Sequence, residues 1–142
     1  MHTFSSGKKV YSVDLMLAYV NIYKPKYKNI LVEDLLHVLE YKGWGNPEKN
    51  IYYSALDVIN NPGRKKYKHE IDRIKNADLK YPIILHKNYI VDGVHRLSKA
   101  FLDGKKTIKA YVFTDIDKFL VSETGKTKFE TYDLIKIFNE RF

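Results

Sequence analysis

The sequence predicts an α+β protein in which a small mixed β-sheet packs against several helices. Three observations lead to this prediction. Of the 142 residues, 44% are hydrophobic and 30% are charged, which is typical of a folded chain rather than a disordered one. Apolar residues recur at helical spacing in several segments, the first of which covers 13–23. Two short apolar runs, 81–85 and 89–91, flank the turn residues Lys87-Asn88, as the strands of a hairpin do.

The first third of the chain predicts two helices around one strand. Ser12 can cap the first helix, and Lys24-Pro25 ends it, because the residue before a proline avoids the helical region. A short apolar run over 29–32 favours a strand. The leucines in 33–41 recur at helical spacing and predict the second helix.

The middle of the chain predicts two further helices. Ser54 and Asp57 resemble a capping box at the start of one, with aspartate in the usual place of glutamate, and Asn61-Pro62-Gly63 closes it. The basic stretch 64–69 then leads into a helix with isoleucines on one face.

A strand–strand–helix–strand unit is predicted from Tyr81 onward. Its parts are the strands 81–85 and 89–91, a helix over 94–102 and a strand over 107–113. Asp103-Gly104 ends its helix, as a left-handed glycine does. Two more helices are expected after this unit, at about 115–122 and 131–139.

Length and composition limit the class of protein. We expect 1–142 to form a single domain, with a core over 29–113 and a C-terminal helical extension over 114–142. No apolar run approaches the roughly 20 residues that span a bilayer, so no membrane partner is expected. The first ten residues lack the apolar stretch of a secretory signal, and the chain has no cysteine. These features predict an intracellular, cytoplasmic protein.

The net charge of +8 favours a polyanion as partner. The densest basic cluster is Arg64, Lys65, Lys66 and Lys68, with Tyr67 inside it, and such a cluster can contact a nucleic-acid backbone. The alternative is an ordinary solvated surface. Most of the 25 basic residues are lysines spread along the whole chain, which a compositional bias also produces.

The segment Asp92-Gly93-Val94-His95-Arg96 joins a predicted strand to a predicted helix. The first turn of a helix has unpaired amide groups and a partial positive charge, and glycine lets a ligand approach the main chain. With His95 and an exposed Arg96 as side-chain donors, the segment predicts a site for an anion, with phosphate as the expected ligand. Asp92 can cap the helix, hold a metal ion or orient His95. The structural alternatives are a plain Asp92 cap, His95 bonded to a carbonyl group and Arg96 paired with a carboxylate.

This part of the sequence resembles the ParB/sulfiredoxin-like superfamily, which includes ParB partition proteins, sulfiredoxins, free serine kinases and many ParB-like nuclease domains. The similarity covers about Tyr81 to Phe113. It is carried by the residues Pro82-Ile83-Ile84-Leu85, Tyr89-Ile90-Val91-Asp92-Gly93-Val94-His95-Arg96-Leu97, Ala100 and Ile108 to Phe113. The fold that the resemblance implies is the ParB/sulfiredoxin-like α+β fold.

The resemblance implies a nucleotide or other phosphate bound by Gly93, Val94, His95 and Arg96. ATP, ADP or CTP with Mg²⁺ is the expected cofactor, with Asp92 near the metal ion and His95 catalytic. Sulfiredoxins carry a cysteine in their Gly-Gly-Cys-His-Arg signature, and this chain has none, so a sulfiredoxin activity is excluded. Partition proteins carry Gly-Glu-Arg-Arg here, which differs from this chain. The Asp-Gly-x-His-Arg form is nearest to free serine kinase-like and uncharacterised members.

In the kinases of this superfamily a glutamate near the early strand acts as the base. Glu33 is the nearest candidate in this chain, with Asp34 and Glu40 as rivals. The expected activity is that of a Mg²⁺-dependent phosphotransferase or nucleotide hydrolase. The alternatives are a nucleic-acid-binding or nuclease-like module and a non-catalytic interaction protein. On the first hypothesis, replacing Arg96 with alanine is expected to abolish nucleotide binding with little loss of stability.

Overall fold

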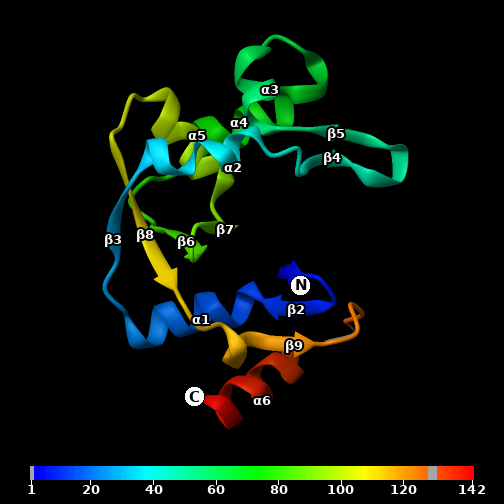
Figure 1. Cartoon of the computed structure of the whole chain (residues 1–142), viewed down its shortest axis with the longest axis vertical. Coiled ribbons are helices and arrows are strands. Elements are labelled where there is room, and N and C mark those ends of the chain that lie inside the picture. Colours follow the sequence, from blue (N-terminus) through cyan, green and yellow to red (C-terminus); the bar gives the residue numbers. More distant parts are fainter. Residues whose placement is uncertain (1, 128–130) are drawn as a thin grey trace. The chain divides into compact units, whose positions relative to one another are not determined.

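The computed structural model describes residues 2–127 and 131–142, with the side chains of 131 and 132 excepted. The described chain divides into two compact units, which consist of residues 27–112 and of residues 1–26 with 113–142. Both units combine helices with small sheets, so the predicted α+β class is confirmed (Figure 1). The single domain expected over 1–142, with its core over 29–113, stays a prediction.

The unit of residues 27–112 contains the predicted strand–strand–helix–strand segment. Its strands are β3 (Lys28–Leu31), β4 (Trp44–Asn46), β5 (Ile51–Tyr53), β6 (Ile83–His86), β7 (Tyr89–Asp92) and β8 (Thr107–Phe113), the last of which ends at the boundary of the unit. Its helices are α2 (Leu36–Glu40), α3 (Ala55–Asn60), α4 (Lys68–Asn76) and α5 (Val94–Leu102), and its 3-10 turns are η1 (Val32–Leu35), η2 (Pro47–Lys49) and η3 (Lys65–Tyr67).

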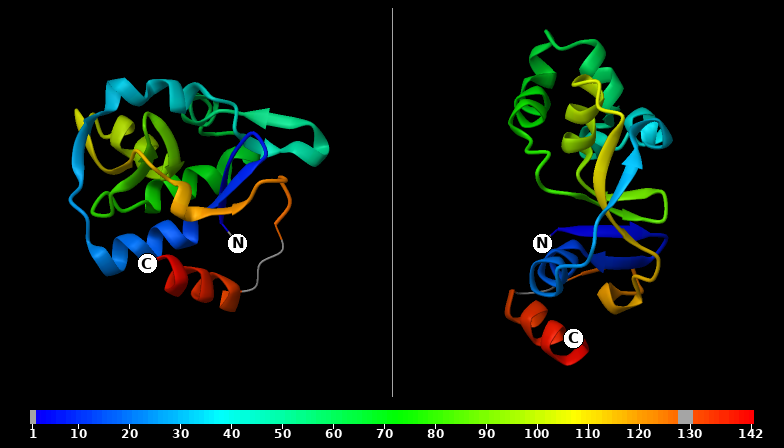
Figure 2. Two further views of the ribbon diagram at one scale, coloured as in Figure 1. Left: turned by 60° about the horizontal axis from the view of Figure 1, so that its bottom comes forward. Right: turned by 90° about the vertical axis from the view of Figure 1, so that its left-hand side faces the viewer.

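A four-stranded sheet with the order β3-β8-β6-β7 forms the centre of this unit. β3 pairs antiparallel with β8, from which it is separated by most of the unit's sequence, and the two lie side by side in Figure 2. β6 pairs antiparallel with β7 through the tight turn at Lys87, whose φ is 55°. This pairing places the end of β7, and with it Asp92, beside Ile84 on β6.

The core of this unit explains where α5 lies. Leu97 and Ala100 of α5 are buried in one apolar cluster with Leu39 of α2 and Leu85 of β6. Phe101, which the spacing predicts to be inside, is 37% exposed. Because burial of apolar area is the main stabilising contribution in a core, this packing fixes α5 against the sheet.

Two features of this unit depart from the sequence prediction. The expected helix over 33–41 begins as the 3-10 turn η1 and becomes α-helical only at Leu36. The stretch between 43 and 53 contains an unpredicted hairpin, in which β4 and β5 pair antiparallel (Figure 1). Gly45 has φ 119°, and a Cβ atom there would lie 2.2 Å from the carbonyl oxygen of Ile51, so glycine permits the pairing.

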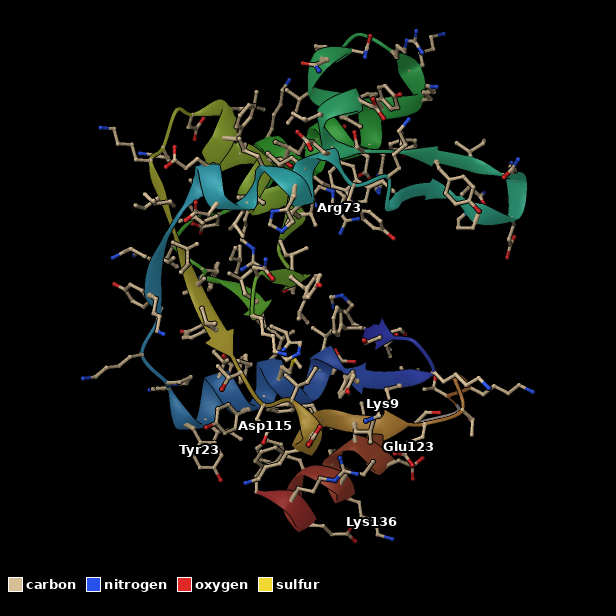
Figure 3. All side chains as sticks on the ribbon, viewed as in Figure 1. Lys9, Tyr23, Arg73, Asp115, Glu123 and Lys136 are labelled. Atoms are coloured by element: carbon tan, nitrogen blue, oxygen red, sulfur yellow. The ribbon has the colours of Figure 1, made fainter. Side chains whose placement is uncertain are left out.

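The terminal unit joins both ends of the described chain. Its elements are β1 (Thr3–Ser6), β2 (Lys9–Ser12), α1 (Val13–Tyr23), the 3-10 turn η4 (Asp117–Phe119), β9 (Leu120–Ser122) and α6 (Thr131–Arg141). The strands form a sheet with the order β1-β2-β9. As predicted, Ser12 caps α1, because its hydroxyl oxygen accepts a hydrogen bond from Leu15 N at 3.2 Å. Tyr23, labelled in Figure 3, donates from its hydroxyl group to the carbonyl oxygen of Phe142 at 3.0 Å.

The helix predicted over 115–122 is wrong. Asp115 instead accepts a hydrogen bond from Asp117 N at 2.9 Å, which forms a tight turn, and η4 and β9 follow it. β9 then pairs antiparallel with β2, and this long-range pairing overrides the local helical spacing. Among the described residues, no helix combines the length and the apolar character that crossing a membrane requires.

Candidate functional site

Gly93 joins β7 to α5 in a conformation that side chains rarely adopt. It is the N-cap of α5, with φ 116° and ψ 26°. A Cβ atom built on Gly93 would lie 2.5 Å from Cγ2 of Ile83, so both the backbone angle and the space require glycine. No side chain caps α5. The structural alternative of Asp92 as the cap is therefore wrong, because the cap position falls one residue later, on Gly93.

Arg96 is held by three hydrogen bonds to the protein. Its Nη1 atom donates to the carbonyl oxygens of Tyr81 at 3.1 Å and Pro82 at 2.7 Å, and its Nη2 atom donates to Oδ2 of Asp92 at 2.9 Å. Only 18% of the Arg96 side chain is exposed. Its description as an exposed donor is therefore wrong: Arg96 ties the residues before β6 to the end of β7 and the first turn of α5.

Asp92 lies at the end of β7, and its carboxylate pairs with Arg96. Within residues 2–127 and 131–142, no three histidine, aspartate or glutamate side chains form a group that could hold a metal ion. Mg²⁺ in proteins is usually bound by one or two carboxylates together with waters and substrate phosphates. The expected place of Asp92 near a metal ion stays a prediction.

His95 contacts two side chains that the sequence prediction did not include in the site. Its Nε2 atom lies 2.9 Å from Oε2 of Glu70, on α4. The side chains of His95 and Glu70 are 20% and 11% exposed, respectively. The Trp44 ring of β4 stacks on the imidazole, with 4.6 Å between ring centroids and 19° between ring planes. α4, α5 and the hairpin thus meet at His95.

The electrostatic environment lowers the pKa of His95. The largest cause is burial, which disfavours the charged imidazolium, and electrostatic interactions with Arg73 and His69 act in the same direction. The hydrogen bond to Glu70 and its charge oppose these effects. Burial, followed by the charge of Glu70, also raises the pKa of Tyr53. His95 is therefore mainly neutral at pH 7, beside a carboxylate that can stabilise its protonated form.

A signal for Glu70 is present in the sequence. Tyr67, Ile71 and Ile74 recur at helical spacing on the inner side of η3 and α4, and Glu70 lies within this apolar stripe. A carboxylate on a buried stripe needs a partner, because burial of an unpaired charge is costly. The partner is His95, 25 positions along the chain, and helical spacing alone does not identify it.

Glu33, the predicted base, lies away from this cluster. It lines a cavity of about 530 Å³ together with Leu36, Gly104 and Lys106, at the C-terminal end of α5. The nine residues of α5 span about 13 Å at the usual rise per residue. The structure therefore brings together His95, Arg96 and Asp92 but not Glu33. Asp34 and Glu40 are exposed.

The basic residues predicted to contact nucleic acid lie before α4 and are exposed: Arg64, Lys65, Lys66 and Lys68. Two of them have partners in the protein. Nζ of Lys66 lies over the Tyr67 ring, 5.0 Å from its centroid, and Nζ of Lys68 pairs with Asp72 at 2.9 Å.

No protein-family model, curated protein or solved structure matches this chain. The resemblance to the ParB/sulfiredoxin-like superfamily stays a prediction.

Proposed function

We propose that this protein binds the phosphate group of a nucleotide, or of another phosphorylated small molecule, at the first turn of α5. The observation that carries the proposal is a helix start that no side chain caps, with His95 in the same turn. The first amides of a helix have no partners within the helix, and its dipole attracts negative charge there. Val94, His95 and Arg96 supply these amides.

Two cationic side chains, Arg96 and Arg73, support an anion at this place. Arg96 uses three of its five N–H groups within the protein, which leaves two for a ligand. Arg73 is exposed on α4, and its charge acts on His95. A nucleotide such as ATP, ADP or CTP would place its phosphates among these groups, and we propose phosphotransferase or nucleotide hydrolase activity on such a ligand.

The proposal is tested by thermal unfolding in the presence of ATP, ADP, CTP, GTP or pyrophosphate, each with and without Mg²⁺. A ligand present at a hundred times its Kd stabilises the native state by about 2.7 kcal/mol. We expect at least one compound to raise Tm by about 5–10 °C, given the unfolding entropy of a chain of this size. Absence of a shift with every compound at millimolar concentration would contradict the proposal.

Arg73→Gln tests where the ligand binds. Arg73 is exposed, so its replacement should leave the stability of the free protein nearly unchanged (Figure 3 labels the side chain). Loss of its charge should weaken nucleotide binding about fivefold and reduce the rise in Tm. Lys75→Gln is the matched control, because Lys75 is exposed on the same helix but does not act on the pKa of His95. Equal weakening by both variants would point to general surface charge.

Nucleic-acid binding is the second candidate, and the exposed run of Arg64, Lys65 and Lys66 favours it. If this run binds DNA, the affinity should fall steeply with salt, because each neutralised phosphate releases counterions. Replacing all three residues with glutamine should then lower the slope of log affinity against log salt by about 2 to 3. Fluorescence anisotropy with a labelled duplex measures both slopes. Equal slopes in the two proteins would exclude this surface.

A further inference from the structure

The hydrogen bond to Glu70 distinguishes the two ring nitrogens of His95. It uses Nε2, the nitrogen farther from the main chain. A carboxylate only accepts hydrogen bonds, so Nε2 of the neutral ring carries the proton and Nδ1 keeps its lone pair. No side chain or carbonyl group in the described part of the chain bonds to Nδ1. By covalent geometry Nδ1 is the ring nitrogen nearer to the His95 main chain, which belongs to the first turn of α5.

We infer that Glu70 is a positioning residue that holds His95 with Nδ1 ready to accept a proton during phosphoryl transfer at the start of α5. This inference rests on the proposed function. The attacking hydroxyl group belongs to water or to an acceptor alcohol. As its oxygen bonds to phosphorus, its proton moves to Nδ1. The bond from phosphorus to the bridging oxygen breaks, and the leaving phosphate keeps that electron pair. The imidazolium that forms donates from Nε2 to the Glu70 carboxylate.

The surroundings of the ring fit this role. Trp44 covers one face of the imidazole, and the protein buries most of it, so the ring has one orientation. The titratable groups that act on its pKa come from α4: Glu70 favours the protonated form of His95, while electrostatic interactions with Arg73 and His69 disfavour it. β4 contributes only the uncharged Trp44 ring. A base that is neutral at pH 7, with a carboxylate to stabilise its protonated form, matches the requirements of general base catalysis.

The other predicted acid–base groups are less suited to this task. Glu33 lies at the opposite end of α5, and the carboxylate of Asp92 pairs with Arg96. Of Glu33, Asp92 and His95, only His95 is oriented, within the described residues, by a side chain of another helix, Glu70 of α4. The role that the resemblance assigned to Glu33 therefore passes to His95 in this inference.

The first test is the NMR spectrum of the histidine rings in the unmodified protein, labelled with ¹⁵N. At pH 7.5 we expect the proton of His95 on Nε2 and an unprotonated Nδ1, and titration should give His95 a pKa below the ordinary value. A proton on Nδ1 at this pH would overturn the inference. This measurement needs no variant and no ligand.

The second test compares Glu70→Gln with Asp72→Asn. Glutamine keeps the size of Glu70 but removes its charge, so the pKa of His95 should fall further. Asp72 is exposed on the same helix and pairs with Lys68, so Asp72→Asn should leave the pKa unchanged. With the nucleotide that raises Tm, phosphate release should slow about tenfold or more in Glu70→Gln only. The acidic limb of its pH–rate profile should move to lower pH together with the pKa of His95. An unchanged rate and profile would overturn the role of Glu70.

The two proposals fail in different ways. Nucleotide binding together with a proton on Nδ1 would overturn the positioning role and leave the phosphate site standing. No nucleotide binding, together with a proton on Nε2, would overturn the phosphate site and with it the proton transfer.

Discussion

Gly93→Ala should lower the free energy of unfolding by about 3 kcal/mol. Two costs add at this position. A residue with a side chain is strained at φ 116°, which costs about 1–3 kcal/mol. The new methyl group would also lie 2.5 Å from Cγ2 of Ile83, a fully buried residue of the central sheet, so the core must shift. Urea denaturation followed by circular dichroism measures the loss.

Gly104→Ala separates these two costs. Gly104 follows α5 with φ 68°, and a Cβ atom there would meet nothing within 4 Å. Only the backbone cost applies, so we expect a loss of about 1 kcal/mol. Equal losses in the two variants would show that contact with Ile83 costs nothing, against the packing described for the start of α5.

Arg96→Ala should also destabilise the protein by about 3 kcal/mol. The substitution removes two charge-assisted hydrogen bonds to carbonyl groups and leaves the part-buried carboxylate of Asp92 without its cation. Hydrogen bonds to charged groups contribute about 1.5–3 kcal/mol each, and partial solvation of the freed groups offsets some of the loss. Urea denaturation in the absence of any ligand tests this prediction.

Arg96→Lys tests whether the charge of Arg96 or the shape of its guanidinium group stabilises the protein. Lysine keeps the charge but lacks the planar guanidinium group that reaches both carbonyl groups and Asp92 at once, so we expect it to recover only part of the stability. Asp92→Asn should be milder than either, because its amide oxygen can still accept from Nη2 of Arg96. If Arg96→Ala unfolded at the same urea concentration as the unmodified protein and lost only nucleotide binding, the guanidinium group would serve the ligand and not the fold.

Much of the fold could be predicted where local sequence decides it. The helix over 94–102 and the strand over 107–113 were predicted with the bounds that the structure has. The capping box at Ser54 and Asp57 is present, with hydrogen bonds in both directions. Each of these features depends on residues a few positions apart, so helical spacing, turn residues and capping residues identify them.

Several of the missed features depend on distant partners, whereas the missed hairpin of β4 and β5 is local. β9 forms because it pairs with the edge of β2, which lies more than a hundred residues earlier in the sequence. The residues of β9 themselves have helical spacing. The acceptors of Arg96 include two main-chain carbonyl groups, which carry no sequence signal. Glu70 is the exception, because an acid within an apolar stripe indicates a buried partner. The prediction therefore gave the wrong surroundings for Arg96 and omitted Glu70, the carboxylate that contacts His95.

The hydrogen bonds of Arg96 to Tyr81, Pro82 and Asp92 affect how the segment Asp92 to Arg96 would change over evolutionary time. Folding requires Asp92, Gly93 and Arg96, so a descendant that did not bind the proposed ligand would still be selected to keep these three residues. Glu70 and His95 are under a different constraint, since two apolar residues of suitable size could replace the pair without loss of packing. Joint retention of an acid at 70 and a histidine at 95 would therefore mark the descendants that kept the proposed proton transfer, whereas retention of Asp92, Gly93 and Arg96 alone would mark only the fold.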